Sequence, residues 1–174
     1  GKPALERARD VAAFWHAGTL DADSNVLYGE GGAGLYSDGK LTSRSKDRRR
    51  ERFVRAAFVG WGAPESVLYD AAAHLGTDRM HGLMAAARAE LCALGVEIRF
   101  GVRVTDFLVE EGRLRGVMAG PSTWRTDHCI LAAGHSARDL YRVLAQRGVP
   151  LEPKPFAVGV RIEQPQRRID TAQW

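Results

Sequence analysis

The sequence predicts an α/β fold, and three stretches of it carry that prediction. The helical pattern of residues 77–94 ends at Gly95 and passes directly into the apolar run "VEIRF", residues 96–100. A second apolar run, "HCILAAG" at 128–134, leads at once into another helical pattern. Such alternation is typical of βαβ units with buried parallel strands. Between the two runs, residues 102–120 alternate apolar and polar side chains, which indicates a β-hairpin.

Periodicity places helices in the first half of the chain. Pro3 suits the first turn of a helix that ends at Gly18. Its apolar stripe is expected at Leu5, Ala8, Val11, Ala12 and Trp15. Two short helices are predicted at 47–62 and 64–76, so the glycine-rich loop before them is followed by a helical insert.

The second half of the chain carries clearer start and stop signals. In the helix of residues 77–94, the expected inner face is Met84, Ala87, Leu91 and Leu94. Gly112 marks the turn of the hairpin. Ser136 is placed to cap a helix over 136–148, and "KPFAVGVRIEQ", residues 154–164, predicts a last strand.

Composition bounds the class of protein. The 174 residues suffice for a folded core, and the 45% hydrophobic and 26% charged fractions are those of globular proteins. No apolar run approaches the ~18 residues that span a bilayer, so we expect no membrane association and a cytoplasmic location. Cys92 and Cys129 have no metal-binding spacing, which predicts buried, reduced thiols and no metal site.

The stretch "GEGGAGLYSDGKL", residues 29–41, matches two nucleotide-binding patterns incompletely. Gly29, Gly31 and Gly34 satisfy G-x-G-x-x-G, but the Asp-Gly pair four residues later interrupts the helix that would have to hold a pyrophosphate. The match to the phosphate loop of nucleoside triphosphatases fails because Leu41 stands where a magnesium-binding hydroxyl is required.

Two interpretations of this loop remain. Its bare backbone amides can approach a flat or anionic ligand closely, with a lysine at hand to supply charge. Alternatively, glycine is present only where two chain segments cross tightly. A second stretch, "CILAAGHSARD" at 129–139, raises the same question. Its small residues Ala132, Ala133 and Gly134 either let a cofactor lie against the strand end or simply pack there.

Four ordered blocks resemble one family, the bacterial FAD-dependent dehydrogenases related to the two-domain, glutathione-reductase-like flavoproteins. The blocks are "SNVLYGEGGAGLYSDGKL", "HLGTDRM", "ILAAGHSARD" and "KPFAVGVRIEQPQ". The resemblance implies a partial Rossmann-like FAD-binding domain with a hairpin or meander insertion, plus part of a substrate domain. It assigns 1–20 and 77–147 to the FAD domain, 21–76 to the loop and helical insert, and 148–174 to the start of a substrate-domain strand region.

The resemblance also implies that the chain is an internal piece of a longer flavoprotein. The pyrophosphate loop and the ribose-binding acid of such proteins would precede residue 1, so the 174 residues alone are expected to hold FAD weakly. Reduced pyridine nucleotide, NAD(P)H, is the implied electron donor and a small molecule the substrate, while the catalytic acid or base is not assigned.

Carried onto this sequence, the resemblance places cofactor-binding residues in three groups. The flavin side would be lined by Gly31, Gly32, Ala33, Gly34, Ser37, Asp38, Gly39 and Lys40. Backbone groups at Arg103 and Val104 would face the adenine, and the turn near the pyrophosphate and ribose would consist of Ala133, Gly134, His135 and Ser136. Lys40 and Arg161 are the candidate cations beside the reduced flavin.

The basic stretch "RSKDRRRERFVR", residues 44–55, supplies much of the net charge of +4. Three interpretations apply to it: a solvated helix end, a site for an anionic substrate or the phosphate of NADPH, and a weak nucleic-acid contact. Few aromatic residues are interleaved, so nucleic acid is not the expected partner. The alternative function for the whole chain is a non-catalytic α/β binding module that uses this basic insert to engage an anionic partner such as nucleic acid.

Overall fold

The structure is a computed structural model, and it describes residues 1–37, 39–41, 45–70, 75–160 and 162–173. The elements follow one another as α1 (Ala4–Ala17), the 3-10 helix η1 (Gly32–Tyr36), α2 (Arg48–Gly60), the 3-10 helix η2 (Glu65–Leu68), α3 (Thr77–Ala93), β1 (Asp106–Glu110), β2 (Arg113–Ala119), β3 (Ser122–Arg125), α4 (Arg138–Gln146) and α5 (Gln166–Gln173). The chain is therefore an α/β protein in the general sense, as predicted. The division into parts of two domains stays a prediction.

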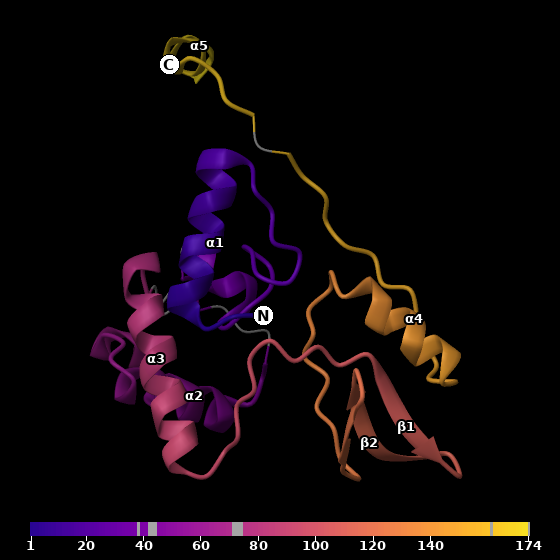
Figure 1. Cartoon of the computed structure of the whole chain (residues 1–174). Helices are drawn as coiled ribbons and strands as arrows, with labels where there is room; N and C mark the ends of the chain where they lie inside the picture. The colour runs from indigo at the N-terminus through magenta and orange to yellow at the C-terminus, as the bar shows by residue number, and fades with distance from the viewer. Residues whose placement is uncertain (38, 42–44, 71–74, 161, 174) are drawn as a thin grey trace.

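The elements gather into two parts with separate cores. Helices α1, α2 and α3 lie together on one side, and the small sheet and α4 lie on the other (Figure 1). Ala63, Val67, Leu75 and Leu83 form the core of the helical part. The predicted face of α3 is wrong in its second half, because Leu91 and Leu94 are exposed.

Helix α1 buries a different face from the predicted one. Gly18 ends the helix in the left-handed conformation, as expected, at φ 67°. However, Leu5 and Trp15 are exposed, whereas Ala4, Arg7 and Val11 are buried. The reason is Arg7, whose fully buried guanidinium donates to backbone carbonyls of the following loop and so fixes which side of the helix faces inward.

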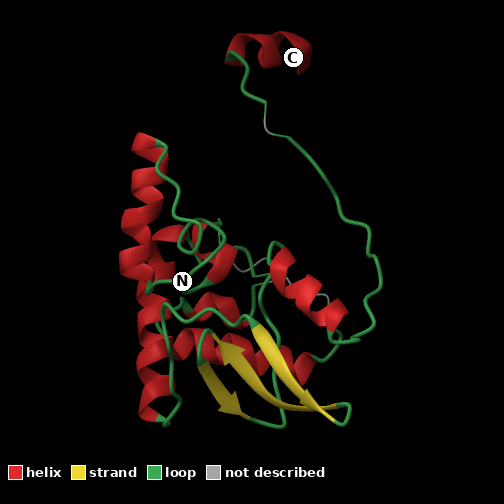
Figure 2. Ribbon diagram, turned by 45° about the vertical axis from the view of Figure 1, so that its right-hand side comes forward, coloured by secondary structure: helices red, strands yellow, loops and turns green. Residues whose placement is uncertain are grey.

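The predicted hairpin is confirmed and belongs to a three-stranded antiparallel sheet in the order β1-β2-β3 (Figure 2). Glu111 and Gly112 both have positive φ, 52° and 74°, as a tight two-residue hairpin turn requires. Phe107 of β1 packs against Ala137 and Leu140, which places α4 on the sheet. The predicted cap of α4 is wrong, since the N-cap position is Ala137 rather than Ser136.

The three apolar runs predicted as strands are not strands in the structure. Residues 96–100, 128–134 and 154–160 have no regular secondary structure, so no parallel Rossmann-type sheet forms among the described residues. A strand needs a neighbour to pair its backbone groups, and no described segment forms a ladder with these runs. Most of their side chains are exposed, most completely that of Ile130, which is 96% exposed, whereas Ile98 and Phe100 are half-buried.

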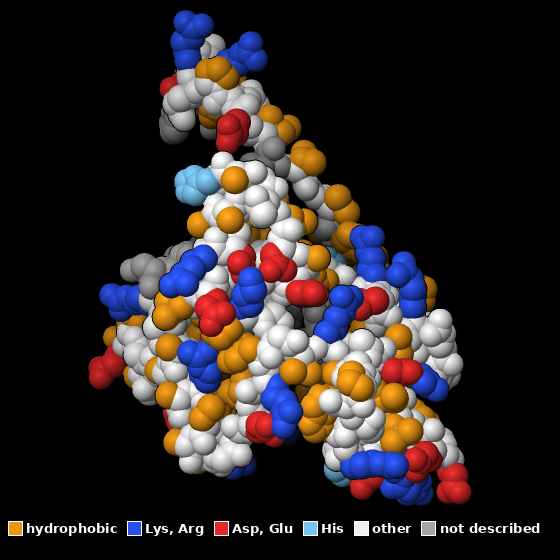
Figure 3. All heavy atoms as spheres, in the orientation of Figure 1, with side chains coloured by type: hydrophobic (Ala, Val, Ile, Leu, Met, Phe, Trp, Pro, Cys, Tyr) orange, Lys and Arg blue, Asp and Glu red, His pale blue; other side chains and the backbone are white. Residues whose placement is uncertain are grey.

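The last of these runs leads away from the rest of the molecule. Residues 149–160 and 162–165 have no regular structure, and α5 lies apart in both views (Figures 1 and 2). Figure 3 shows hydrophobic side chains in a row along this extension. Phe156, Val158 and Val160, each about 80% exposed or more, alternate with small residues as in a strand that lacks a partner.

Candidate functional site

A cleft of about 620 Å³ lies between the helical part and the sheet part. Its walls come from four segments, at 21–29, 101–107, 129–133 and 137–140, together with the N-terminal residues. This volume is in the usual range for small-molecule sites. The cleft therefore forms where segments distant in sequence meet, and Figure 3 shows acidic and basic side chains gathered on this side between α1 and α4.

Charged side chains bridge the edge of the cleft. Arg103 donates to Asp139 of α4 at 2.6 Å and to Asp23 at 3.4 Å. The hydrogen bond from Arg103 lowers the pKa of Asp139, and the pKa of Arg103 is correspondingly raised. All three side chains are more than half exposed, and exposed ion pairs contribute only ~0–1 kcal/mol. A ligand can therefore replace this bridge at little cost.

The rest of the cleft is built from small and apolar residues. Gly29 and Gly101 can offer only backbone to it, Ala133 adds a small residue, and Phe107 and Leu140 belong to the core of the sheet part. Where glycine lines the wall, a flat ring can lie against the backbone. The cleft thus combines an apolar surface for a ring with carboxylates that can accept hydrogen bonds from hydroxyl groups.

A network beside the cleft ties α1 to the loop that follows it. Lys2 Nζ lies 2.8 Å from Asp10 and 3.0 Å from Asp21, and Ser24 Oγ donates to Asp10 at 2.5 Å. The hydrogen bonds from Lys2 and then Ser24 lower the pKa of Asp10. The side chain of Asp10 is largely buried, so protonating it removes acceptors that the buried Ser24 hydroxyl requires.

We expect acid to destabilise the protein through this network. Asp10 has a lowered folded-state pKa, so its contribution to stability is present above its unfolded value of 3.8 and is lost as the pH falls through the folded value. Thermal unfolding followed by circular dichroism should show Tm falling below about pH 4. Asp10→Asn should have a lower Tm at neutral pH and a shallower fall in acid. An equally steep fall in Asp10→Asn would contradict the assignment.

The structure brings some of the predicted site residues together. Arg103, Val104 and Ala133 line the cleft. Gly134 and His135 join Ala133 in an adjoining pocket of about 380 Å³. Ser136 lies next to this pocket, with its Oγ 3.4 Å from the Nε2 atom of His135.

The described residues of the glycine-rich loop lie outside the lining of these two sites, except for Gly29 at its start. Packing explains several of its glycines: a Cβ on Gly29 would lie 2.4 Å from Arg7 Cδ, and one on Gly31 would lie 3.3 Å from Met84 Cγ. A Cβ on Gly39 would lie 3.0 Å from the amide of Gly76. The tight crossing of chain segments thus accounts for these three positions.

Other predicted residues of the loop face open space. Nothing lies within 4 Å of the Cβ position of Gly32 or Gly34, so a ligand can approach their backbone. The other described members of this group, Ala33, Ser37 and Lys40, are exposed, and none of them lines either site. Asp38 and Arg161 lie outside the described residues.

Sequence reasoning missed two features of the site. Asp23 and Asp139 border the cleft. The only sequence signal for either was that Asp139 ends the block "ILAAGHSARD". Arg7 holds the loop that follows α1 through the carbonyls of Asn25 and Glu30. Its helical spacing from Ala4 and Val11 was the available signal that it shares their buried face. The cysteines were predicted to be buried and are exposed, with no disulfide between them, and Cys129 lines the cleft.

The described residues offer neither a metal-binding cluster nor a membrane-spanning helix. They contain no group of three or more His, Cys, Asp or Glu side chains that could hold a metal ion. None of the helices in the described ranges is long and apolar enough to cross a membrane.

Comparison with known proteins gives one informative match. The chain is 39% identical, over all 174 residues, to an uncharacterized protein of Clostridium beijerinckii (strain ATCC 51743 / NCIMB 8052). The match covers 32% of that protein, so the chain spans about a third of the length of this relative. No family model matches the chain.

Proposed function

We propose that the chain is part of a longer FAD-dependent oxidoreductase and that the cleft between its two parts receives the adenosine half of FAD. The observation that carries the proposal is the meeting of Arg103, Val104 and Ala133 in one cleft. These residues come from two segments about thirty positions apart. The resemblance to FAD-dependent dehydrogenases expects both segments beside the adenosine half of FAD.

The chemistry of the cleft suits this ligand. The backbone at Ala132 and Ala133 and the side chain of Phe107 offer a surface for the adenine ring. The carboxylates of Asp23 and Asp139 can accept hydrogen bonds from ribose hydroxyls, the role that an acidic side chain plays in many dinucleotide sites. The same carboxylates repel a pyrophosphate, so we place that group away from them, beside the turn at Gly134 and His135, where the resemblance expects it.

In this proposal FAD, when bound, supplies the redox chemistry, and the protein binds it, orients it and excludes water. The exposed backbone of Gly32 and Gly34 is the candidate contact for the flavin side. Lys40 and Arg161 remain the candidate cations there. NAD(P)H is the proposed electron donor, and the proposed substrate is a small molecule.

The visible absorption spectrum of the purified full-length protein tests this function. We expect the bands of an oxidised flavin, either as isolated or after incubation with FAD and removal of the excess. We also expect the bands to bleach anaerobically on addition of dithionite and to return in air. Pure, folded protein that shows no flavin bands after FAD addition would refute the proposed function.

A further inference from the structure

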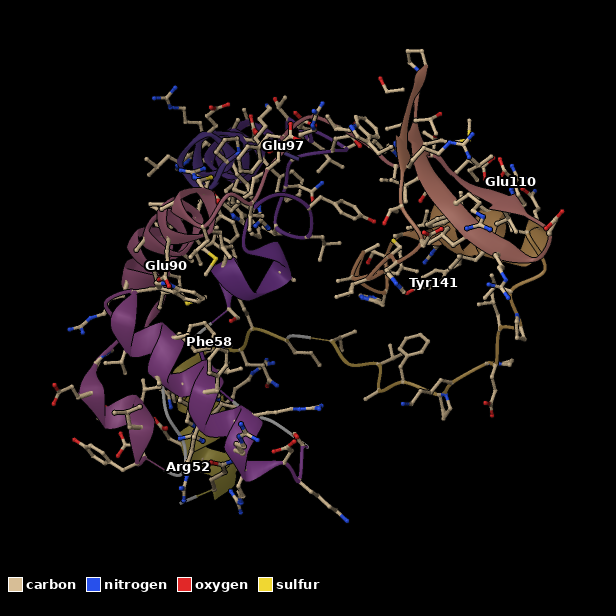
Figure 4. All side chains as sticks on the ribbon, turned by 90° about the horizontal axis from the view of Figure 1, so that it is seen from below. Arg52, Phe58, Glu90, Glu97, Glu110 and Tyr141 are labelled. Carbon is tan, nitrogen blue, oxygen red and sulfur yellow. The ribbon has the colours of Figure 1, made fainter. Side chains whose placement is uncertain are left out.

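A second cleft, of about 760 Å³, lies on the helical part, away from the sheet. It is lined by residues of α2 and of the segments that precede α2 and follow η2. Figure 4 labels one of its residues, Arg52, on α2. Its lining includes four cations of the basic stretch, which the proposed flavin site does not use: Lys46, Arg48, Arg52 and Arg55.

Two of the cations in this cleft, Arg48 and Arg55, pair with Glu51, and the other two have no partner among the described residues. Arg55 donates to Glu51 at 2.9 Å and to the carbonyls of Val67 and Asp70, so it holds α2 against η2. Both side chains of the Arg55–Glu51 pair are only 17% exposed. Lys46 and Arg52 are exposed and form no hydrogen bond or ion pair through their side chains with any described residue.

Among the described residues, the lining has two more basic than acidic side chains. Lys46, Arg48, Arg52 and Arg55 face two carboxylates, those of Glu51 and Asp70. The aromatic side chain of Tyr69 also lines the cleft and is 76% exposed. An exposed tyrosine is suited to stacking on a planar ring, and guanidinium groups bind phosphate oxygens through charge-assisted hydrogen bonds.

The first turn of α2 offers no free backbone amides at Arg49 and Arg50 to an anion. The carboxylate of Asp47 already accepts hydrogen bonds from the amides of Arg49 and Arg50, so the N-terminus of the helix is capped. Among the cations that line the cleft, Lys46 and Arg52 have no partner among the described residues.

We propose that this second cleft binds a small phosphomonoester that carries a ring, with Lys46 and Arg52 on the phosphate and Tyr69 on the ring. A dianionic phosphate balances the charges of Lys46 and Arg52, which have no partner among the described residues. Nucleic acid fits less well, because Glu51 and Asp70 interrupt the positive surface that a polyanionic backbone would follow. The site is separate from the proposed flavin site and does not depend on it.

Isothermal titration of the full-length protein, saturated with FAD, with phenyl phosphate, inorganic phosphate and phenol tests this site. We expect phenyl phosphate to bind most tightly, inorganic phosphate more weakly and phenol not measurably. Arg52→Gln should weaken phenyl phosphate binding by about tenfold, the effect of one lost charge-assisted hydrogen bond. Tyr69→Ala should weaken phenyl phosphate binding but leave inorganic phosphate binding unchanged.

Arg49→Gln is the matched control, because it removes the same charge from the same helix at a position that does not line the cleft. It should change phenyl phosphate binding less than twofold. Equal losses in Arg49→Gln and Arg52→Gln, or no binding of phenyl phosphate, would overturn the proposal. Tighter binding of a single-stranded oligonucleotide, lost steeply with salt, would overturn it in favour of a nucleic-acid surface. Flavin content is measured in each variant, so failure of this site and failure of the proposed function are distinguished.

Discussion

Replacing Gly29 by alanine is expected to lower the free energy of unfolding by roughly 3 kcal/mol or more. The backbone of Gly29 has φ 120°, a conformation that residues with a side chain rarely adopt. The new Cβ would also lie 2.4 Å from Arg7 Cδ. Arg7 cannot move aside freely, because its Nε donates to the carbonyl of Asn25 at 2.7 Å and its Nη1 to that of Glu30 at 2.6 Å.

The cost follows from the burial of Arg7. Its guanidinium is fully buried and lies 4.9 Å from the centre of the Tyr36 ring, and burial lowers its pKa. If the side chain shifts, a buried cation and two carbonyls lose their hydrogen bonds together, which is among the more expensive changes in a protein interior. The absence of a side chain at Gly29 therefore leaves the space that the Arg7 side chain occupies.

Urea unfolding of Gly29→Ala and Gly34→Ala measures this effect. Gly34 lies in the same loop, has no positive φ, and has nothing within 4 Å of its Cβ position, so Gly34→Ala should change stability by less than about 0.5 kcal/mol. Equal stability of the two variants would show that Arg7 is not held against Gly29 as the structure indicates.

The local elements of the fold could be predicted from sequence because their signals are local. Gly18 and Gly112 end a helix and turn a hairpin through their own backbone conformations, and both were correctly placed. The 3.6-residue periodicity of apolar side chains located α1, α2, α3 and α4. Such signals depend on residues a few positions apart, so they do not require knowledge of the whole molecule.

The prediction of the parallel strands was wrong because strand pairing is not a local property. "VEIRF" and "HCILAAG" have the composition of buried parallel strands, but pairing depends on residues far away in the sequence. No described segment pairs with them. The buried face of α1 was misjudged similarly, because apolar periodicity pointed to Leu5 and Trp15, whereas the carbonyls of the following loop select Arg7.

For the candidate cleft, the sequence indicated two of the segments that line it, but it did not indicate which charged side chains contact one another there. The turn at Ala133 and the backbone near Arg103 line one cleft, as expected of residues that share a ligand. The carboxylates of Asp23 and Asp139 were not foreseen, since an aspartate in a loop or at a helix start has many ordinary roles. Their pairing with one arginine appears only when the chain is folded.

Filling the first cleft is expected to have the second large effect, on cofactor binding. Ala133 lines the cleft, so Ala133→Trp places a large side chain beside the position where the adenosine is proposed to lie. FAD affinity should fall by at least about tenfold, equivalent to 1.4 kcal/mol or more. Ala145→Trp is the control, because Ala145 is an exposed residue of α4 that lies outside the cleft.

The most direct test is therefore a titration of FAD into the full-length protein stripped of bound flavin, comparing the unaltered sequence with these two variants by quenching of flavin fluorescence. The proposed site predicts equal FAD affinity for the unaltered protein and Ala145→Trp, and at least about tenfold weaker binding to Ala133→Trp. Unchanged FAD affinity in a correctly folded Ala133→Trp protein would contradict the placement of the adenosine in this cleft.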